Sequence, residues 1–337
     1  MTLEEFLDEW NNDSERVLVH TSGSTGTPKP LWVEKRRMEA SARITCDFLG
    51  LKEGDTALLC MPLDYIAGKM MVVRSLVRKL KLMVVEPTGH PLAAHQLPRG
   101  LTFAAMVPMQ VYNSLQVPEE RERLRQIRHL IIGGGAIDDA LARELKDFPN
   151  YVWSTYGMTE TLSHIALRRL NGAEASEWYT PFDNVRISQS EDGCLVIDAP
   201  EVCAERLVTN DIVEISQGRF RVVGRKDNVI CSGGIKIQAE EVERALKPHL
   251  HVPFMITKRK DEKFGEIVVM MVEDRGERKE ERGERIEESL ETRLQRLCRE
   301  HLPKYWQPRD FVFVERIPMT ETGKIARKEC QCRIENG

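Results

Sequence analysis

The chain has 337 residues, more than one hydrophobic core usually organises, so we expect a large domain and a smaller one. With 41% hydrophobic residues, 30% charged residues and a net charge of −4, it lacks the basic surface that nucleic acid requires. No apolar run approaches the roughly 20 residues that span a bilayer, and the acidic start is unlike a secretory signal. We therefore expect a cytoplasmic protein whose partners are small molecules. The sequence leaves homo-oligomerisation open.

Apolar runs alternate with helical patterns in the first half of the chain. The runs are 56–62, 80–86, 102–108 and 129–134, and the helical stretches include 35–49, 69–79 and 138–147. This alternation predicts an α/β fold with a mostly parallel sheet. Ligands bind outside the carboxyl ends of the strands in such sheets, so we expect the chemistry in the loops that follow the runs.

The pattern changes to short alternating strands between about residue 178 and residue 223, which predicts a small β subdomain. A compact α+β pattern then continues to the end, with Ile286, Leu290, Leu294 and Leu297 at helical spacing. We therefore predict one domain over 1–225, including the subdomain at 178–223, and a smaller α+β domain over 226–337.

The strongest local signal is a loop of hydroxyls, glycines and one lysine that follows the apolar strand at 17–19. Glycines let the backbone approach phosphate, hydroxyls and amide groups donate hydrogen bonds, and the lysine adds a charge. The spacing of the glycines is not that of a Walker A loop. The alternative is a flexible polar linker. The loop comprises Thr21, Ser22, Gly23, Ser24, Thr25, Gly26, Thr27 and Lys29.

Together with four later segments in the same order, this loop resembles the signature of the adenylate-forming superfamily of acyl-CoA synthetases. The resemblance implies ATP, Mg²⁺ and coenzyme A as a substrate. In the second segment, Tyr156-Gly157-Met158-Thr159-Glu160, it implies adenine stacking for Tyr156, α-phosphate contact for Thr159 and Mg²⁺ ligation for Glu160, while Gly157 belongs to the nucleotide site. Taken alone, the segment would also fit a buried turn with a capping threonine.

The third and fourth segments concern the ribose and the boundary between the domains. Thr209-Asn210-Asp211 stands in place of the family's Thr-Gly-Asp, and the resemblance implies that Asp211 accepts hydrogen bonds from the ribose. Asparagine tolerates left-handed backbone angles, so we expect a turn to survive at Asn210. By the same resemblance Arg225 reaches the ribose, and Asp227 is the hinge of a mobile C-terminal domain.

The continuation of the fourth segment and the fifth segment lie in the smaller domain. Gly233, Gly234 and Lys236 resemble the segment that approaches coenzyme A in the second half-reaction, where glycine permits close backbone approach. Lys324, in Pro318-Met319-Thr320-Glu321-Thr322-Gly323-Lys324, is the implied catalytic lysine. An ammonium group between the two reacting anions would stabilise the adenylation transition state. Catalysis is thus assigned to Lys324, Thr159 and Glu160.

Short members with this outline, and with Gly133, Gly134 and Gly135 before the Tyr-Gly segment, resemble the o-succinylbenzoate–CoA ligases of menaquinone biosynthesis. The resemblance assigns the three glycines to the walls of the adenine and aryl pocket. The chain begins almost at the phosphate loop and lacks the large N-terminal portion that most relatives possess. We therefore expect an acyl pocket that is rebuilt or supplied differently.

Four side chains are candidates for the acid substrate. Tyr65 stands where relatives often carry a histidine and can stack on or hydrogen-bond a carboxylate. Lys69 or Arg74 can pair with a second carboxylate, although either can be an ordinary surface cation. His164, one helical turn before Arg168, is a fourth candidate and fits a structural role equally well.

Two other functions remain open. One keeps adenylation but changes the acid, or replaces coenzyme A by the phosphopantetheine arm of a carrier protein. The other is a degenerate relative that binds nucleotide without turnover. Retention of Lys324, Glu160, Asp211 and the whole phosphate loop favours an AMP-forming acid–thiol ligase.

Overall fold

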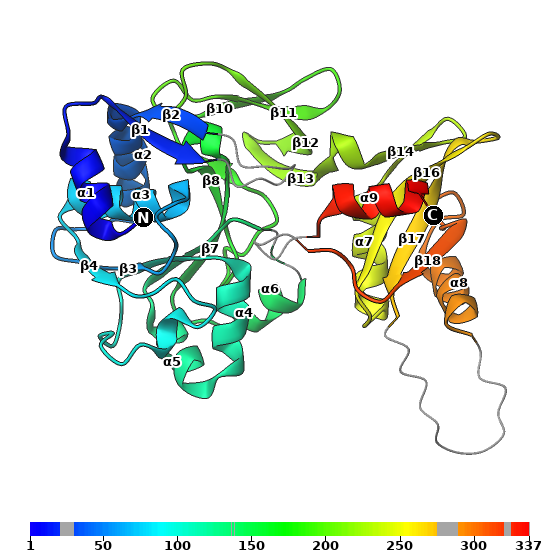
Figure 1. Cartoon of the computed structure of the whole chain (residues 1–337), viewed down its shortest axis with the longest axis horizontal. Coiled ribbons are helices and arrows are strands. Elements are labelled where there is room, and N and C mark those ends of the chain that lie inside the picture. Colours follow the sequence, from blue (N-terminus) through cyan, green and yellow to red (C-terminus); the bar gives the residue numbers. More distant parts are fainter. Residues whose placement is uncertain (21–29, 136, 138, 275–288, 320–324, 337) are drawn as a thin grey trace. The chain divides into compact units, whose positions relative to one another are not determined.

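The computed structural model describes residues 1–20, 30–135, 137, 139–274, 289–319 and 325–336 (Figure 1). Its backbone contacts divide the chain into two units. The first unit comprises Met1–Ser188, Val196–Val208 and Ile215–Arg221, and the second comprises Gln189–Leu195, Thr209–Glu214 and Val222–Gly337. Among the described residues, no helix has both the length and the apolar character that crossing a membrane requires.

A seven-stranded sheet with the order β4-β3-β5-β6-β7-β8-β9 forms the centre of the first unit. The strands from β4 to β7 pair in parallel, and β8 and β9 add an antiparallel edge. Its members are β3 (Thr56–Leu59), β4 (Lys81–Val84), β5 (Phe103–Met106), β6 (His129–Ile132), β7 (Tyr151–Gly157), β8 (His164–Arg169) and β9 (Thr180–Pro181). The predicted α/β fold with a mostly parallel sheet is confirmed.

Helices cover this sheet, and the buried side chains of β3, β5 and β6 form a core with those of α4 to α6. Pro108 and Pro118 occupy the first turns of α4 and α5, where a missing N–H leaves no helical bond unmade. The helices are α1 (Leu3–Asn11), α2 (Lys35–Phe48), α3 (Ile66–Arg78), α4 (Pro108–Gln116), α5 (Pro118–Gln126) and α6 (Asp139–Leu145), with short 3-10 turns η1 (Pro91–Ala93) and η2 (Thr159–Thr161).

Two smaller sheets follow the predicted strand patterns. The antiparallel hairpin β1 (Arg16–His20) and β2 (Pro30–Glu34) contains the apolar strand that precedes the predicted phosphate loop. A four-stranded sheet has the order β10-β11-β12-β13. Its strands are β10 (Arg186–Gln189), β11 (Cys194–Asp198), β12 (Leu207–Ser216) and β13 (Arg219–Arg225).

The second unit contains a five-stranded sheet. Its strands have the order β15-β14-β17-β16, and β18 also pairs with β17. Its elements are β14 (Val229–Ser232), β15 (Ile235–Gln238), β16 (Phe254–Asp261), β17 (Gly265–Glu273), β18 (Asp310–Val314), α7 (Ala239–Leu246), α8 (Leu290–His301), α9 (Arg327–Asn336), η3 (Lys226–Asn228) and η4 (Lys247–His249).

Both faces of this second sheet are buried. Val268 and Met270 of β17 pack with residues of α7 and α8, whereas Val269 and Met271 pack with residues of α9. Because successive side chains of a strand point to opposite faces, β17 needs an unbroken apolar sequence to fill both cores. The predicted helix is confirmed at Leu290, Leu294 and Leu297 as α8, whereas Ile286 lies outside the described residues.

Candidate active site

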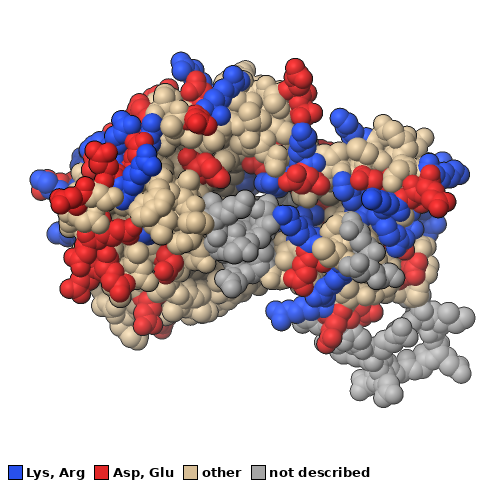
Figure 2. Space-filling model, turned by 45° about the horizontal axis from the view of Figure 1, so that its top comes forward, with Lys and Arg blue, Asp and Glu red and all other residues tan. Residues whose placement is uncertain are grey.

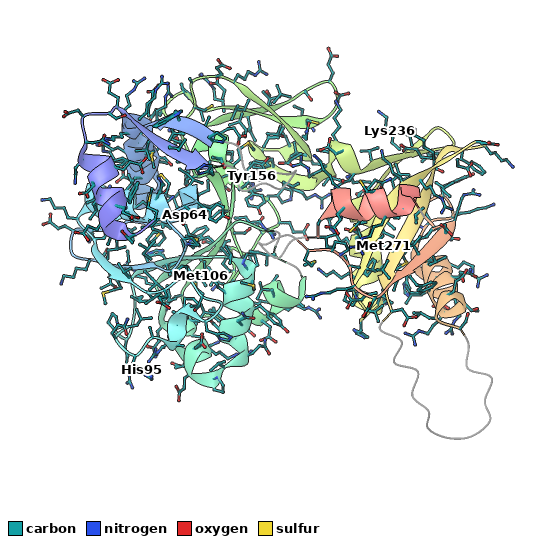
Figure 3. The ribbon with its side chains drawn as sticks, in the orientation of Figure 1. Asp64, His95, Met106, Tyr156, Lys236 and Met271 are labelled. Atoms are coloured by element: carbon teal, nitrogen blue, oxygen red, sulfur yellow. The ribbon has the colours of Figure 1, made fainter. Side chains whose placement is uncertain are left out.

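The ends of three parallel strands contact one another at one edge of the large sheet. The N–H of Gly133, after β6, donates to the carbonyl of Met106 at the end of β5 (3.1 Å). A Cβ atom on Gly133 would lie 2.4 Å from Thr155 Oγ1 of β7, so any side chain there would displace the threonine hydroxyl. Figure 3 labels Met106 and Tyr156, which lie at the ends of β5 and β7. This edge is the carboxyl edge at which ligands of α/β sheets bind.

The strand order changes direction between β3 and β5, and Tyr65 lies in the loop that follows β3. Tyr65 is half-buried, occupies the N-cap position of α3 without a side-chain capping bond, and forms a parallel bridge with His20, the last residue of β1. His20 in turn pairs with Pro30 at the start of β2. Tyr65 therefore lies beside the two strand ends that flank residues 21–29. The predicted phosphate-loop residues themselves, Thr21 to Thr27 and Lys29, lie outside the described residues.

Aromatic side chains surround Tyr156. Its ring contacts Phe220 edge-on with 4.9 Å between ring centroids, and it lies 5.8 Å from Tyr179. The Tyr179 hydroxyl is 2.8 Å from Ser154 Oγ, which fixes the second ring. Aromatic rings pack favourably in tilted and edge-on arrangements, so these two contacts hold the ring of Tyr156 in place. No sequence pattern indicated Tyr179 or Phe220, because they meet Tyr156 only through tertiary contact.

The turn that contains Thr159 and Glu160 is tightly constrained. A Cβ atom on Gly157 would lie 2.3 Å from the carbonyl oxygen of Ser163, so only glycine allows β7 to approach the start of β8 this closely. Leu162 has a left-handed backbone with φ of 65°, a conformation that strains a branched side chain. Thr159 is buried within this turn, and the carboxylate-bearing residue Glu160 is exposed.

Lys69 and Arg74, two of the proposed acid-binding cations, lie inside the fold. Lys69 Nζ is 2.9 Å from both a carboxylate oxygen of Glu9 and the carbonyl oxygen of Leu18, and its side chain is 2% exposed. Arg74 is also 2% exposed and donates from Nη2 to Ser163 Oγ at 2.5 Å. Both sets of contacts favour structural roles. Neither residue is the surface cation that the sequence offered as the alternative.

His164 lies on a strand rather than on a helix. The helical spacing expected between His164 and Arg168 is wrong, because both belong to β8, which pairs with β7. The ring of His164 is buried and contacts Thr45 Oγ1 (3.2 Å) and Ser163 Oγ (3.1 Å) through its two nitrogens. Burial, and then the charge of Arg74, hold the pKa of His164 well below its usual range, so the ring is neutral. This environment also favours a structural role.

In the second unit, the predicted ribose and hinge residues form a connected group. Arg225 donates from Nη1 to Asp211 (3.2 Å) and from Nη2 to Asp227 (3.1 Å). Asp211 and Asn210 lie inside strand β12, so the expected turn at Asn210 is wrong. Positive backbone angles among described non-glycine residues occur only at Lys79, Leu162 and Gln217, so Asn210 does not use the left-handed region.

The β14–β15 hairpin carries the residues expected near coenzyme A. Gly233 and Gly234 have φ of 58° and 82°, which matches the twisted two-residue turns of hairpins. Lys236 is exposed on β15 and is labelled in Figure 3. Lys324 lies outside the described residues. Of its neighbours that are described, Met319 and Ile325 form an antiparallel bridge.

The described residues do not by themselves enclose a metal ion. No group of three or more His, Cys, Asp or Glu side chains that could hold a metal occurs among the described residues. Acidic and basic side chains are interspersed over the face drawn in Figure 2.

Comparison with known proteins agrees with these features. The family model described as AMP-binding enzyme matches residues 5–198, and that of the AMP-binding enzyme C-terminal domain matches residues 241–324. A Bacillus cereus 2-succinylbenzoate–CoA ligase is 25% identical over 357 aligned positions, which cover 97% of this chain and 72% of the relative.

Solved structures give the same result. An acyl-CoA synthetase (AMP-forming)/AMP-acid ligase II-like protein from Dyadobacter fermentans is 34% identical with a TM-score of 0.65, covering 98% of this chain and 93% of that chain. The o-succinylbenzoate coenzyme A synthetase of Bacillus subtilis, in complex with ATP and magnesium, has a TM-score of 0.72 at 23% identity. The match covers 93% of this chain and 69% of that chain. The chain therefore belongs to the AMP-binding enzyme family, among its acid–CoA ligases.

Proposed function

We propose that the chain joins o-succinylbenzoate to coenzyme A through an acyl-adenylate, a step of menaquinone biosynthesis. The observation that carries the ligase chemistry is the convergence of Tyr156, Thr159 and Glu160 on the carboxyl edge of the parallel sheet. The choice of acid is supported by the 2-succinylbenzoate–CoA ligases among the relatives, which match 97% of this chain.

In the first half-reaction, a carboxylate oxygen of the acid attacks the α-phosphorus of ATP, and the bond to pyrophosphate breaks. The proposed roles are phosphate binding for residues 21–29, adenine packing for Tyr156 and α-phosphate contact for Thr159. Charge builds up on the phosphorus oxygens in this step, so Lys324 is proposed to stabilise it. Asp211 and Arg225 are proposed to bind the ribose.

The residues that are described fit a magnesium site of the kind that ATP brings with it. Mg²⁺ usually keeps several waters and binds through one or two carboxylates together with phosphate oxygens. The exposed carboxylate of Glu160, on the turn that also contains Thr159, is the proposed protein ligand. Bound there, the ion would supply charge neutralisation for the phosphates.

In the second half-reaction, the thiol of coenzyme A loses its proton to solvent, the sulfur attacks the acyl carbonyl, and AMP leaves. The open glycine turn at Gly233 and Gly234 is proposed to admit the pantetheine arm, with Lys236 beside it. Because each half-reaction needs different groups at one intermediate, residues 1–225 and 226–337 are proposed to act as domains that reorient about Asp227.

Tyr65 remains the strongest candidate for contact with the acid. It is half-buried beside the end of β1, whereas Lys69 and Arg74 direct their charges to partners inside the fold. A phenol at this position can stack on an aryl ring and donate a hydrogen bond to a carboxylate.

The test incubates purified protein with ATP, Mg²⁺, coenzyme A and o-succinylbenzoate, and analyses the products by mass spectrometry. We expect AMP and o-succinylbenzoyl-CoA. If other aryl or alkyl acids give thioesters and o-succinylbenzoate gives none, the proposed substrate is wrong but the chemistry stands. If pyrophosphate is never released with any acid, the ligase function itself is refuted. Transfer to a carrier protein in place of coenzyme A would change only the acceptor.

A further inference from the structure

The ammonium group of Lys69 is enclosed by three different groups inside the first unit. Its Nζ is 2.9 Å from a carboxylate oxygen of Glu9 and 2.9 Å from the carbonyl oxygen of Leu18. It also lies 5.1 Å from the ring centroid of Phe6, within the range of a cation–π contact. The side chain is 2% exposed, so these partners replace water around the charge. Because a buried charge needs a paired opposite charge, Glu9 is the group that allows a lysine at this position of α3.

Glu9 completes these contacts from α1. One of its carboxylate oxygens binds Lys69, and the other accepts a hydrogen bond from the N–H of Leu18 at 3.1 Å. Both backbone groups of Leu18 are therefore bonded to side chains, the N–H to α1 and the carbonyl to α3. Glu9, Lys69 and Leu18 form a closed set of three contacts, which we call the edge clamp. Figure 1 shows α1, β1 and α3 side by side, as this set requires.

The edge clamp takes the place of a third strand beside β1. In the part of the chain that the structure describes, β1 pairs along its length only with β2, and a sheet of two strands is marginally stable by itself. The outer edge of such a sheet presents N–H and C=O groups that need partners. Leu18, in the middle of β1, finds them on Glu9 and Lys69. The clamp thereby fixes β1 without another strand.

Two further contacts connect the edge clamp with residues proposed to bind substrate. Lys69 lies one helical turn after Tyr65, and its N–H donates to the carbonyl of Tyr65 (3.3 Å). His20, two residues after Leu18, forms a bridge with Tyr65. The strand β1 and the start of α3 are thus joined at two points. β1 leads directly into the predicted phosphate loop, whereas Tyr65 is the candidate for contact with the acid.

We infer that Glu9 and Lys69 are positioning residues for adenylation, which hold the strand before the phosphate loop against the Tyr65 loop and so place ATP and the acid relative to each other. The rate of reaction between two bound molecules depends on this relative placement. In the acyl-adenylate the two molecules are joined covalently, so the second half-reaction no longer needs it. The inference rests on the proposed function for this catalytic consequence, whereas the clamp itself does not depend on the substrate.

The main test measures both half-reactions in Lys69→Met, which keeps an unbranched side chain and removes the ammonium group. We expect the kcat for adenylation, followed as pyrophosphate release, to fall by about tenfold. The KM values for ATP and for the acid should each change by less than about threefold, and thioester formation from preformed acyl-adenylate by less than about twofold. The ratio of the two rates does not depend on the fraction of folded protein, so a merely structural loss would leave this ratio unchanged.

Lys79→Met is the matched control for this ratio. Lys79 follows α3 and pairs with Glu53 at 3.3 Å, but its side chain is 72% exposed, and an exposed ion pair contributes little. The variant should keep the wild-type ratio of the two half-reactions. An equal loss of both half-reactions in Lys69→Met, or the same ratio in Lys69→Met and Lys79→Met, would overturn the inference.

Glu9→Gln tests whether the two residues act as a pair. Lys69→Met leaves the carboxylate of Glu9 without its cation, and glutamine removes that uncompensated charge. The double variant should therefore melt at a higher temperature and adenylate faster than Lys69→Met, although Glu9→Gln alone should lower both quantities. Additive losses would show that Glu9 and Lys69 act separately and would refute the pair. If Lys69→Met does not fold, Glu9→Gln takes its place, with the same selective loss of adenylation expected.

Amide hydrogen exchange tests the edge clamp without any substrate. Exchange over residues 16–20 should accelerate in Lys69→Met and stay at the wild-type rate in Lys79→Met, because only the first variant releases the edge of β1. Unchanged exchange in Lys69→Met would show that the clamp does not hold this strand. If the wild type adenylates no acid, the proposed function fails, and the exchange measurement still decides whether the clamp exists.

Discussion

At the scale of single residues, the glycine of the Tyr-Gly segment is explained by packing. A Cβ atom on Gly157 would lie 2.3 Å from Ser163 O and 2.4 Å from His164 Cα, and both are backbone atoms that cannot rotate away. We expect Gly157→Ala to destabilise the protein by about 1–3 kcal/mol through overpacking. The displaced turn should also abolish pyrophosphate release by the folded fraction.

The control for this prediction is Gly54→Ala, where a Cβ atom would meet no atom within 4 Å and only the φ of 86° is unfavourable. It should be destabilised by about 1–2 kcal/mol and should adenylate normally. Thermal unfolding and pyrophosphate release measure the two effects. Normal adenylation by Gly157→Ala would show that the close contact with Ser163 is not needed for catalysis.

His129, a histidine outside the proposed site, makes stability depend on pH. Burial, followed by the charges of Arg128 and Arg169 and opposed by Asp55, lowers the pKa of His129 to about 4 from 6.5. The unfolded chain therefore binds the proton more tightly between these values. The stabilisation is complete above pH 6.5 and is lost as the pH falls from 6.5 towards 4.

The variant His129→Phe keeps a ring that can stack on Tyr151, which lies 4.9 Å away between centroids, and it cannot titrate. We expect its melting temperature to fall less than that of the wild type on acidification through this range. Parallel pH profiles of the two proteins would show that His129 does not contribute to acid sensitivity.

Residue identities predicted the site motifs, but they did not predict the partners of those motifs. Lys69 was predicted as an acid-binding candidate because it follows the loop that contains Tyr65. Its ammonium group is instead bound by Glu9, 60 residues away in the sequence. Tyr179 and Phe220 likewise lie beside Tyr156 although they are distant from it in the sequence. Contacts between residues distant in sequence depend on packing, which a single sequence does not display.

At the scale of elements, periodicity predicted the sheet well where strands are buried on both faces. The runs around β3, β5 and β6 are almost continuously apolar because helices cover both sides. Periodicity was ambiguous at β8, where His164 and Arg168 are four residues apart. That spacing places side chains on one face of a strand as well as of a helix, so only the pairing with β7 decides.

Two hairpin turns provide a matched test of the proposed coenzyme A segment. Gly234 in the β14–β15 turn and Gly218 in the β12–β13 turn have φ of 82° and 74°, and a Cβ atom on either would meet nothing within 4 Å. Gly234→Ala and Gly218→Ala should therefore destabilise their turns to a similar extent.

Only Gly234→Ala should slow thioester formation from preformed acyl-adenylate, by about tenfold, because a methyl group there would crowd an approaching pantetheine arm. Adenylation should be spared in both variants. The assay follows the thioester after addition of coenzyme A to synthetic adenylate. Equal rates in the two variants would remove the β14–β15 turn from the second half-reaction.

At the scale of the whole molecule, the residues that the sequence predicts to bind the nucleotide are divided between the two units. Tyr156 and Glu160 belong to the first unit, whereas Asp211 and Arg225 belong to the second. Composition and length predicted two domains, and the motif order predicted that each contributes to one reaction. The proposed domain boundary at residue 226 remains a prediction, because it is defined by the proposed reorientation of the two domains.

That motion is tested by restricting the backbone at Asp227. Asp227 lies in the short turn η3, and its carboxylate accepts from Arg225. Proline fixes φ near one value, so Asp227→Pro should hold the domains in one arrangement. We expect one half-reaction to be retained and the other to slow by about tenfold or more, measured as pyrophosphate release and as thioester formation from adenylate.

Asp227→Ala is the control, because it removes the carboxylate and leaves the backbone unrestricted. Since each half-reaction is proposed to need a different set of groups around the same intermediate, a hinge restriction must separate the two rates. Loss of the contact with Arg225 should instead affect ATP binding alone. If Asp227→Pro slows both half-reactions equally, or neither, the two sets of groups do not exchange by rotation at this residue, and the catalytic cycle must be completed in a single arrangement of the domains.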